Sequence, residues 1–369
     1  MSAPHYPAAR NHAVALAEHF ARHATGGEAA PADAAAIETM IDAAFWASLQ
    51  REEGYAPEIS LALLPPERAV RPLLLAAPLP LAARALARLA PAVERPGIHL
   101  GVWRAAGELV VWGTTRAIPS ACFVVEVIRP GLLVVKHRLR DDSAKFRNVA
   151  VFEGEEVKIL GGRPLDTACS PALLRSLIAP EPSDGAPADD VLLRLAVSMR
   201  AHKRGGALLV VPEGSEAWRD SIVRPITYAV TPPFTELRDR AREALAPGPR
   251  DYAALGRVVD AVAGLTAIDG ATLINDRYEL LGFGVKIGRP DGRPRVEQVV
   301  VSEPIEGGAA VTMAPLQLGG TRHISAAQFA QDQPDALAMV ASQDGRFTLF
   351  AWSPRKSVVH AHRVESLLL

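Results

Sequence analysis

The stretch from Leu318 to Phe329 reads Leu-Gly-Gly-Thr-Arg-His-Ile-Ser-Ala-Ala-Gln-Phe, and we expect the rest of the chain to be organised around it. Its glycines carry no Cβ, so the backbone can approach a ligand closely. Its arginine offers a planar fork of donors that suits phosphate oxygens, and its histidine can donate or accept near neutral pH. The serine can cap a helix, whose N-terminus is itself an anion site. The candidate ligand-holding residues here are Gly319, Gly320, Thr321, Arg322 and His323.

A second stretch upstream, Ala267 to Ile274, places Asp269 against Gly270 inside an apolar, strand-like run. Burying a charge is costly without a partner, and a metal–phosphate complex would supply one. Taken alone, each stretch has a simpler explanation. Asp-Gly is suited to a turn at a strand end, and the later stretch can be an ordinary loop leading into a helix. The two stretches point to a ligand site only when they are considered together.

Three segments occur in a set order: Asp269-Gly270-Ala271, then Gly320-Thr321-Arg322-His323, then the run from Asp335 to Gln343. In this order they resemble the diadenylate cyclase domain, the nucleotide-binding domain of DNA-integrity-scanning proteins and of membrane-bound cyclic di-AMP synthases. The resemblance covers roughly residues 190–355. The chain also looks similar to a divergent branch of that superfamily that has been proposed to act as nucleotide sensors.

The resemblance implies a role for each matching residue. Asp269 would bind Mg²⁺ or Mn²⁺ bridging the phosphates, and in a cyclase it would help to activate the ribose 3′-hydroxyl. Gly270 and Ala271 would present backbone close to the nucleotide. The remaining nucleotide-binding residues that the resemblance implies are Gly320, Thr321, Arg322, His323 and Ser342.

One departure from the family pattern bears on function, because the family has a second arginine where this chain has Ile324. The change removes a cation from the triphosphate site, and the sequence does not show whether Lys286 or Lys203 replaces it. Phosphoryl transfer depends on such cations because they neutralise developing charge, whereas binding is less sensitive to their loss. We therefore predict a nucleotide-binding protein that senses ATP or a cyclic dinucleotide in bacterial signalling.

The alternative is an active diadenylate cyclase that converts two ATP molecules to cyclic di-AMP with a divalent metal. The resemblance implies that such an enzyme is a homo-oligomer, since the family's cyclases react across a face-to-face dimer.

Composition sets broader limits. The 369 residues allow two or three domains, and a net charge of −1 lacks the basic bias that nucleic-acid binding usually shows. Cys122 and Cys169 make no metal pattern or disulfide framework, and the N-terminus has no secretion signal, so we expect a cytoplasmic protein. The most apolar stretch, Pro72 to Ala83, is interrupted by Pro78 and Pro80. It is shorter than the ~20 residues that span a bilayer, so we expect no membrane segment.

The spacing of apolar residues divides the chain into four parts. Residues 1–95 predict a mainly helical N-terminal region, and residues 96–178 a small β-rich domain with an antiparallel sheet or barrel. Residues 179–189 are rich in proline and predict a linker. Residues 190–369 alternate helices and strands, which predicts an α/β sandwich with a mixed central sheet. The resemblance makes this last part a domain of the diadenylate cyclase type.

Apolar periodicity also predicts the elements that would form the core of the last part. The predicted helices cover 232–245, 252–265 and 325–331, and the predicted strands cover 207–211, 267–274, 277–283, 336–342 and 346–352.

Overall fold

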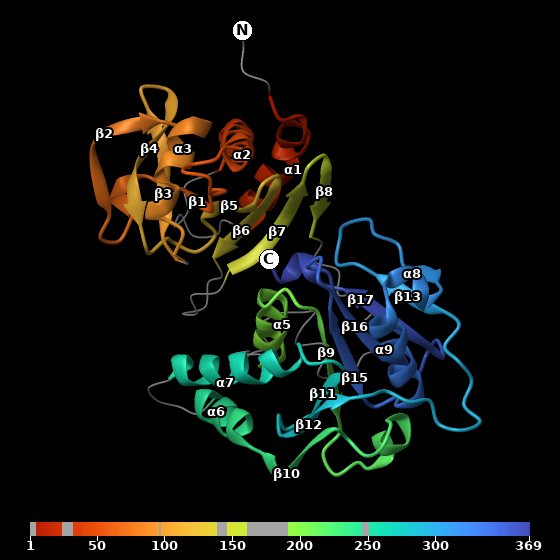
Figure 1. The fold of residues 1–369 in the computed structure, drawn as a ribbon. Helices are drawn as coiled ribbons and strands as arrows, with labels where there is room; N and C mark the ends of the chain where they lie inside the picture. The colour runs from red at the N-terminus through yellow and green to blue at the C-terminus, as the bar shows by residue number, and fades with distance from the viewer. Residues whose placement is uncertain (1–4, 24–31, 96, 139–145, 161–190, 246–250) are drawn as a thin grey trace. The chain divides into compact units, whose positions relative to one another are not determined.

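The computed structural model describes residues 5–23, 32–95, 97–138, 146–160, 191–245 and 251–369. The chain divides near residue 161 into two compact units, and each contains helices packed on a mixed sheet (Figure 1). The expected α/β class is therefore confirmed. The predicted linker at 179–189 lies outside the described residues. No helix in the described ranges has both the length and the apolar character that a transmembrane span requires.

The N-terminal unit is built on an eight-stranded sheet with the order β2-β4-β3-β1-β5-β6-β7-β8. β1 pairs with β3 in parallel, and its other neighbour, β5, is antiparallel. Three helices cover one face of this sheet, where Ile37, Met40 and Ile41 are buried with Leu61 and Phe123. The elements are α1 (Pro7–His23), α2 (Ala34–Ser48), β1 (Ile59–Leu63), β2 (Leu73–Pro80), α3 (Ala83–Leu89), β3 (His99–Ala105), β4 (Glu108–Thr115), β5 (Phe123–Arg129), β6 (Leu132–Arg138), β7 (Phe146–Glu153) and β8 (Glu156–Ile159).

The expected boundary between residues 95 and 96 does not separate two bodies. β1 and β2 come from the part expected to be mainly helical, yet they lie in one sheet with β3 to β8. The strand β2 was not expected, because its run contains Pro78 and Pro80. Proline is tolerated at the edge of a sheet, where one side of the strand needs no hydrogen-bond partner, and β2 is the edge strand here.

The C-terminal unit is built on a nine-stranded sheet with the order β10-β12-β11-β9-β15-β16-β17-β13-β14. β9 and β11 are parallel, as are β13 and β17, whereas β15 and β16 are antiparallel to their neighbours. The elements are α5 (Val191–Ala201), β9 (Gly206–Val211), β10 (Tyr228–Phe234), α6 (Glu236–Leu245), α7 (Tyr252–Leu265), β11 (Ala271–Asn275), β12 (Leu280–Val285), β13 (Val299–Ser302), β14 (Val311–Met313), α8 (Pro315–Leu318), α9 (Thr321–Asp332), β15 (Leu337–Ala341), β16 (Phe347–Ser353) and β17 (Val358–Arg363).

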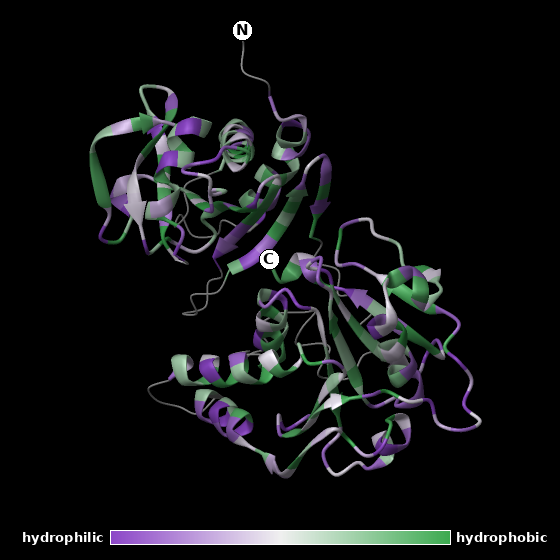
Figure 2. Cartoon of the chain, in the orientation of Figure 1, coloured by the Kyte–Doolittle hydropathy of each residue, from purple (hydrophilic) through white to green (hydrophobic). Residues whose placement is uncertain are grey.

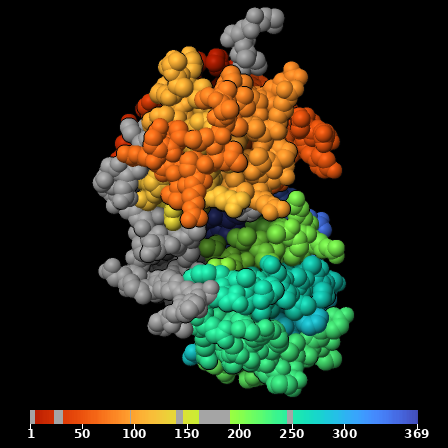
Figure 3. All heavy atoms as spheres, turned by 90° about the vertical axis from the view of Figure 1, so that its left-hand side faces the viewer, coloured from red at the N-terminus to blue at the C-terminus, as the bar shows by residue number. Residues whose placement is uncertain are grey.

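Both faces of this second sheet are covered by helices, which makes the unit the expected α/β sandwich with a mixed sheet. Leu208 and Val210 of β9 pack with α5, α6 and α7, while the alternate residues Leu209 and Val211 pack with α9 on the other face. Burial on both faces explains why β9 is a continuous apolar run. The central strands are accordingly mostly green in Figure 2, and Figure 3 shows the face that α5, α6 and α7 cover.

Several element boundaries in this unit differ from the prediction, and the strand expected over 277–283 runs from Leu280 to Val285. The helix expected from residue 232 begins at Glu236, because the preceding residues form the edge strand β10, which accommodates their prolines. The strand expected from Ala267 begins at Ala271, so Asp269 lies in the turn before it. The helix expected from Ser325 begins at Thr321. The first of these last two differences moves Asp269 from a strand into a turn, and the second moves Thr321, Arg322 and His323 from a loop into the first turn of α9.

Candidate functional site

Five neighbouring strands of the C-terminal sheet have one end each in the same row, at one end of the sheet. β9, β11 and β16 begin there, while β12 and β15 end there, as their pairing shows: Ala271 lies opposite Val285, and Ala341 lies opposite both Gly206 and Phe347. The segments just outside these strands are therefore brought together, although they are far apart in sequence.

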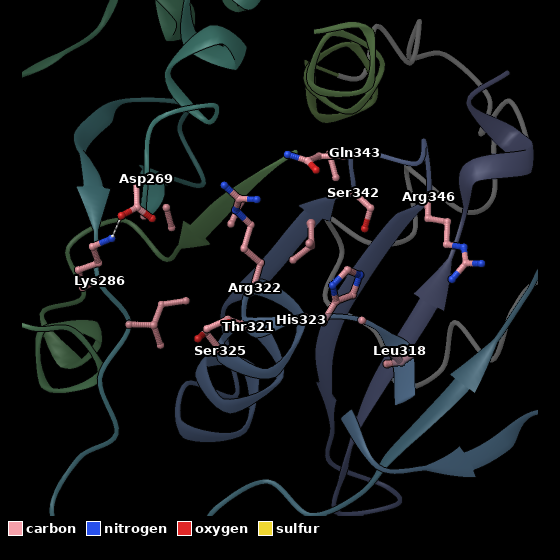
Figure 4. A pocket seen from close by; sticks show the side chains of 18 of the residues that line it. Asp269, Lys286, Leu318, Thr321, Arg322, His323, Ser325, Ser342, Gln343 and Arg346 are labelled. Carbon is pink, nitrogen blue, oxygen red and sulfur yellow. Dashed lines mark hydrogen bonds and ion pairs between the residues drawn. The ribbon is translucent and has the colours of Figure 1, made fainter. Parts of the chain in front are cut away.

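A cavity opens at these strand ends. Its volume of about 720 Å³ is within the usual range of small-molecule sites. Its lining comes from the start of β11, the end of β12, the N-terminus of α9 and the turn between β15 and β16 (Figure 4). All the candidate residues of the two sequence stretches line it, as does Ser342. They are Asp269, Gly270, Ala271, Gly319, Gly320, Thr321, Arg322, His323 and Ser342.

The N-terminus of α9 faces this cavity with Gly320 as its N-cap. Because glycine has no side chain, no capping side chain occupies the backbone N–H groups of the first turn. The first turn of a helix has backbone N–H groups without partners inside the helix, and the helix dipole gives that end a partial positive charge. The start at Thr321, four residues earlier than expected, therefore puts backbone donors at the cavity as well as side chains.

Arg322 extends from the first turn of α9 into the cavity, and its guanidinium lies between Asp269 and Gln343 in the view of Figure 4. It forms no hydrogen bond or ion pair with any part of the chain that the structure describes. Its Nη1 atom lies so close to Gly205 that a Cβ on that glycine would be 3.0 Å away. The absence of a side chain at Gly205 thus leaves room for a half-buried cation whose donors are available to a ligand.

His323 is held rigidly at the inner side of the cavity. Its side chain is buried, and its ring makes an edge-to-face contact with Phe350 at 6.1 Å between centroids. Burial lowers the pKa of His323, so the ring is neutral near pH 7 and can both donate and accept a hydrogen bond.

Gly319 makes room for this ring, and the contact leads to a prediction. A Cβ at residue 319 would lie 2.5 Å from Nδ1 of His323, and the buried ring cannot move freely away. We expect Gly319→Ala to lower the free energy of unfolding by about 1–2 kcal/mol through overpacking, and to weaken ligand binding by displacing the imidazole. Urea unfolding measures the first effect. Gly256→Ala, where a Cβ meets nothing within 4 Å, is the control. Equal stability of the two variants would contradict the assignment of Gly319 as a packing residue.

Asp269 is paired with Lys286, a contact that could not be predicted from the sequence. The Lys286 ammonium donates a 2.6 Å hydrogen bond to Oδ2 of Asp269, and the carboxylate is 91% exposed. This hydrogen bond and the charge of Lys286 lower the pKa of Asp269. Lys203, the other cation considered from the sequence, does not line the cavity. Lys286 directly follows β12, and the pairing of β12 with β11 brings it to Asp269.

Gly270 has a packing role that the sequence did not reveal. Its φ is +118°, a conformation that L side chains rarely adopt, and a Cβ there would lie 2.5 Å from the carbonyl carbon of Gly284. The start of β11 therefore approaches β12 backbone to backbone at this point. This close approach holds the turn that carries Asp269.

The residues of the cavity do not form a metal site of their own. It has two lining carboxylates, of which Asp269 is paired with Lys286, and Asp344 approaches Nε of Arg346 at 3.4 Å. No group of three or more His, Cys, Asp or Glu side chains that could hold a metal ion occurs in the described ranges. Mg²⁺ is usually bound by one or two carboxylates together with substrate phosphates. Here such an ion would have to compete with Lys286 for Asp269.

Ile324, which stands where the resembling family has an arginine, does not line the cavity and is 36% exposed on α9. The cations that line the cavity come from other positions, namely Lys286, Arg322 and Arg346. Two further lining residues were missed by sequence reasoning. Gln343 directly follows the predicted residue Ser342, and this position was the signal for it. Arg346 is brought to the site by the pairing of β15 with β16.

Comparisons with known proteins add one family match and several weak structural likenesses. Residues 27–116, in the N-terminal unit, match a family model described as "Probable sensor domain DACNV". No curated protein matches the chain. A crystal structure of a hypothetical membrane spanning protein from Bacillus cereus is similar at 15% identity with a TM-score of 0.26, over 49% of this chain and 65% of that one. A double mutant of DacA from Staphylococcus aureus is similar at 12% identity with a TM-score of 0.23, over 46% of this chain and 83% of that one.

Proposed function

We propose that the C-terminal unit binds a nucleotide through its phosphates, and that the chain acts as a sensor of ATP or of a cyclic dinucleotide. One observation carries this proposal: segments that are distant in sequence line a single cavity and bring two anion-binding features to it. These features are the N-terminus of α9 and Arg322, which has no ion-pair partner among the described residues. Anions are favoured by both features. The neutral His323 adds a donor, and the hydroxyls of Thr321 and Ser342 add more.

The sensing part of the proposal is supported by the match of residues 27–116 to a probable sensor domain. The match lies in a stretch to which the sequence motifs assigned no role, whereas the motifs and the cavity belong to the C-terminal unit. We therefore propose that the N-terminal unit takes part in the sensor function, while the C-terminal unit binds the nucleotide. We also propose that the protein is cytoplasmic, because ATP is available in the cytoplasm and thiols stay reduced there. The buried Cys122 is a free thiol whose pKa is raised to about 12 by burial.

A second candidate function is diadenylate cyclase activity, and the positive charges of the cavity lining favour it. The lining holds Lys286, Arg322 and Arg346 as possible phosphate contacts. Asp269, which would help to activate the ribose hydroxyl, also lines the cavity. As an enzyme the protein would have to be a homo-oligomer and would need Mg²⁺ or Mn²⁺, which the residues of a single chain do not hold well.

One pair of measurements tests the proposal and its alternative. Binding of ATP and of cyclic di-AMP to the full chain is measured by isothermal titration calorimetry. In parallel, the protein is incubated with ATP and Mn²⁺, and cyclic di-AMP is sought by chromatography, with Asp269→Asn alongside. Binding without product supports the sensor, and product that disappears in the variant establishes the cyclase. If neither nucleotide binds, the proposed function is wrong.

A further inference from the structure

The pairing of Asp269 bears on how a phosphate would be neutralised in the cavity. A divalent ion that bridges protein and phosphate needs carboxylate oxygens as ligands. Oδ2 of Asp269 instead accepts a hydrogen bond from Lys286 at 2.6 Å, and Asp344 is engaged by Arg346. Both carboxylates of the lining therefore already have a positive partner.

The backbone around Lys286 is held in place by strand pairing and a hydrogen bond. Val285 pairs with Ala271, and the carbonyl oxygen of Lys286 accepts a hydrogen bond from the backbone N–H of Val223. Lys286 is thus held opposite the turn of Asp269 and lines the cavity beside it. An ammonium group has three N–H donors, and Asp269 uses one of them. The other two remain for phosphate oxygens.

We propose that the nucleotide is bound without a divalent metal ion, and that the Lys286 ammonium supplies the positive charge that a metal would otherwise provide. This inference rests on the proposed function and names its ligand class. The ligand is a phosphodiester such as a cyclic dinucleotide, which carries one negative charge per phosphate. Lys286 and Arg322 can neutralise two such charges directly. ATP concentrates more charge on adjacent phosphates, which is why its sites usually include Mg²⁺.

Asp269 then has the opposite effect from that of a metal ligand. In a metal-bridged site its carboxylate attracts the ion and through it the phosphate, so removal of its charge weakens binding. In a metal-free site the carboxylate repels the phosphate and occupies one donor of Lys286. Removal of its charge then leaves binding unchanged or strengthens it. The direction of the effect of Asp269→Asn distinguishes the two arrangements.

The experiment is calorimetric titration of the full chain with cyclic di-AMP and with ATP, each in Mg²⁺ and in EDTA. We expect cyclic di-AMP to bind with the same affinity in both buffers. Lys286→Met should weaken this binding about 10-fold, as the loss of one partly exposed charged hydrogen bond implies, and Asp269→Asn should not weaken it. Lys203→Met removes an exposed lysine that does not line the cavity and should bind as the unchanged protein does.

Two results would overturn the inference and leave the proposed function standing. One is nucleotide binding only in Mg²⁺, with Asp269→Asn weakening it. The other is binding in EDTA that Lys286→Met does not change. Absence of binding for both nucleotides in both buffers is a different result, because it contradicts the proposed function itself. Lys286 is about half exposed, so its replacement should not affect folding, and circular dichroism checks this.

Discussion

Arg322→Ala is expected to weaken nucleotide binding about 100-fold. The guanidinium can form two charge-assisted hydrogen bonds with one phosphate, and at the lower limit of about 1.5 kcal/mol for each bond the two together correspond to a change of this size. Arg322 has no ion-pair partner among the described residues, so its donors are not shared with another carboxylate. Isothermal titration calorimetry with ATP and cyclic di-AMP measures the change.

Two variants control for this result. Arg257→Ala removes an exposed arginine from α7, which covers the sheet on the side opposite α9, and should leave binding unchanged. Arg322→Lys keeps the charge but loses the planar fork, so it should bind with intermediate affinity. Because Arg322 makes no hydrogen bond within the described ranges, its loss should change the free energy of unfolding by less than about 1 kcal/mol. If Arg322→Ala binds as tightly as the unchanged protein, the cavity does not hold the phosphates.

Gly270→Ala should have the largest effect on stability, lowering the free energy of unfolding by about 3 kcal/mol. The added Cβ would lie 2.5 Å from the backbone of Gly284, and backbone atoms of a paired strand cannot move aside as a flexible side chain can. Overpacking costs about 1–3 kcal/mol, and a positive φ adds about 1–2 kcal/mol for a residue with a Cβ. Reduced entropy of the unfolded chain offsets less than 1 kcal/mol of this.

Urea unfolding measures this loss, and hydrogen–deuterium exchange assigns it to a unit. Peptides from β11 and β12 should exchange faster, whereas peptides from the N-terminal unit should be unaffected. The control is Gly320→Ala, a glycine of the same cavity with φ −75° and no atom within 4 Å of its added Cβ. Wild-type stability in Gly270→Ala would show that the backbones of β11 and β12 separate without cost.

Much of the fold follows from local patterns in the sequence. The helix α7 has the predicted limits, Tyr252 to Leu265, because its apolar residues recur at helical spacing and Asp251 caps its N-terminus. The strand β9 was predicted over 207–211 from its unbroken apolar run, and its residues pack on both faces of the sheet. In these elements local preference and tertiary packing agree.

The parts that could not be predicted depend on neighbours in the sheet. β2 and β10 contain prolines that argue against strands, and both form because they lie at an edge. The early start of α9 depends on Gly319 and Gly320 rather than on the capping serine expected at residue 325. Lys286 reaches Asp269 because of the pairing between β11 and β12, and its position in the sequence does not carry that information. The roles of the candidate residues in binding remain predictions.

The arrangement of the site at the ends of five strands has a consequence for how this protein can change during evolution. The polar side chains that line the cavity come from turns and from the N-terminal part of α9, whereas the folding core consists largely of alternating apolar residues within the strands. Mutations of the exposed residues among these polar side chains can therefore alter ligand choice with little effect on the core. A descendant of this chain could acquire a new ligand by changing residues such as Lys286 and Gln343 while its sheet stays intact. Ala271 and Val285 are exceptions because they line the cavity and belong to the buried core, and so is Gly270, which lines the cavity and joins two strands.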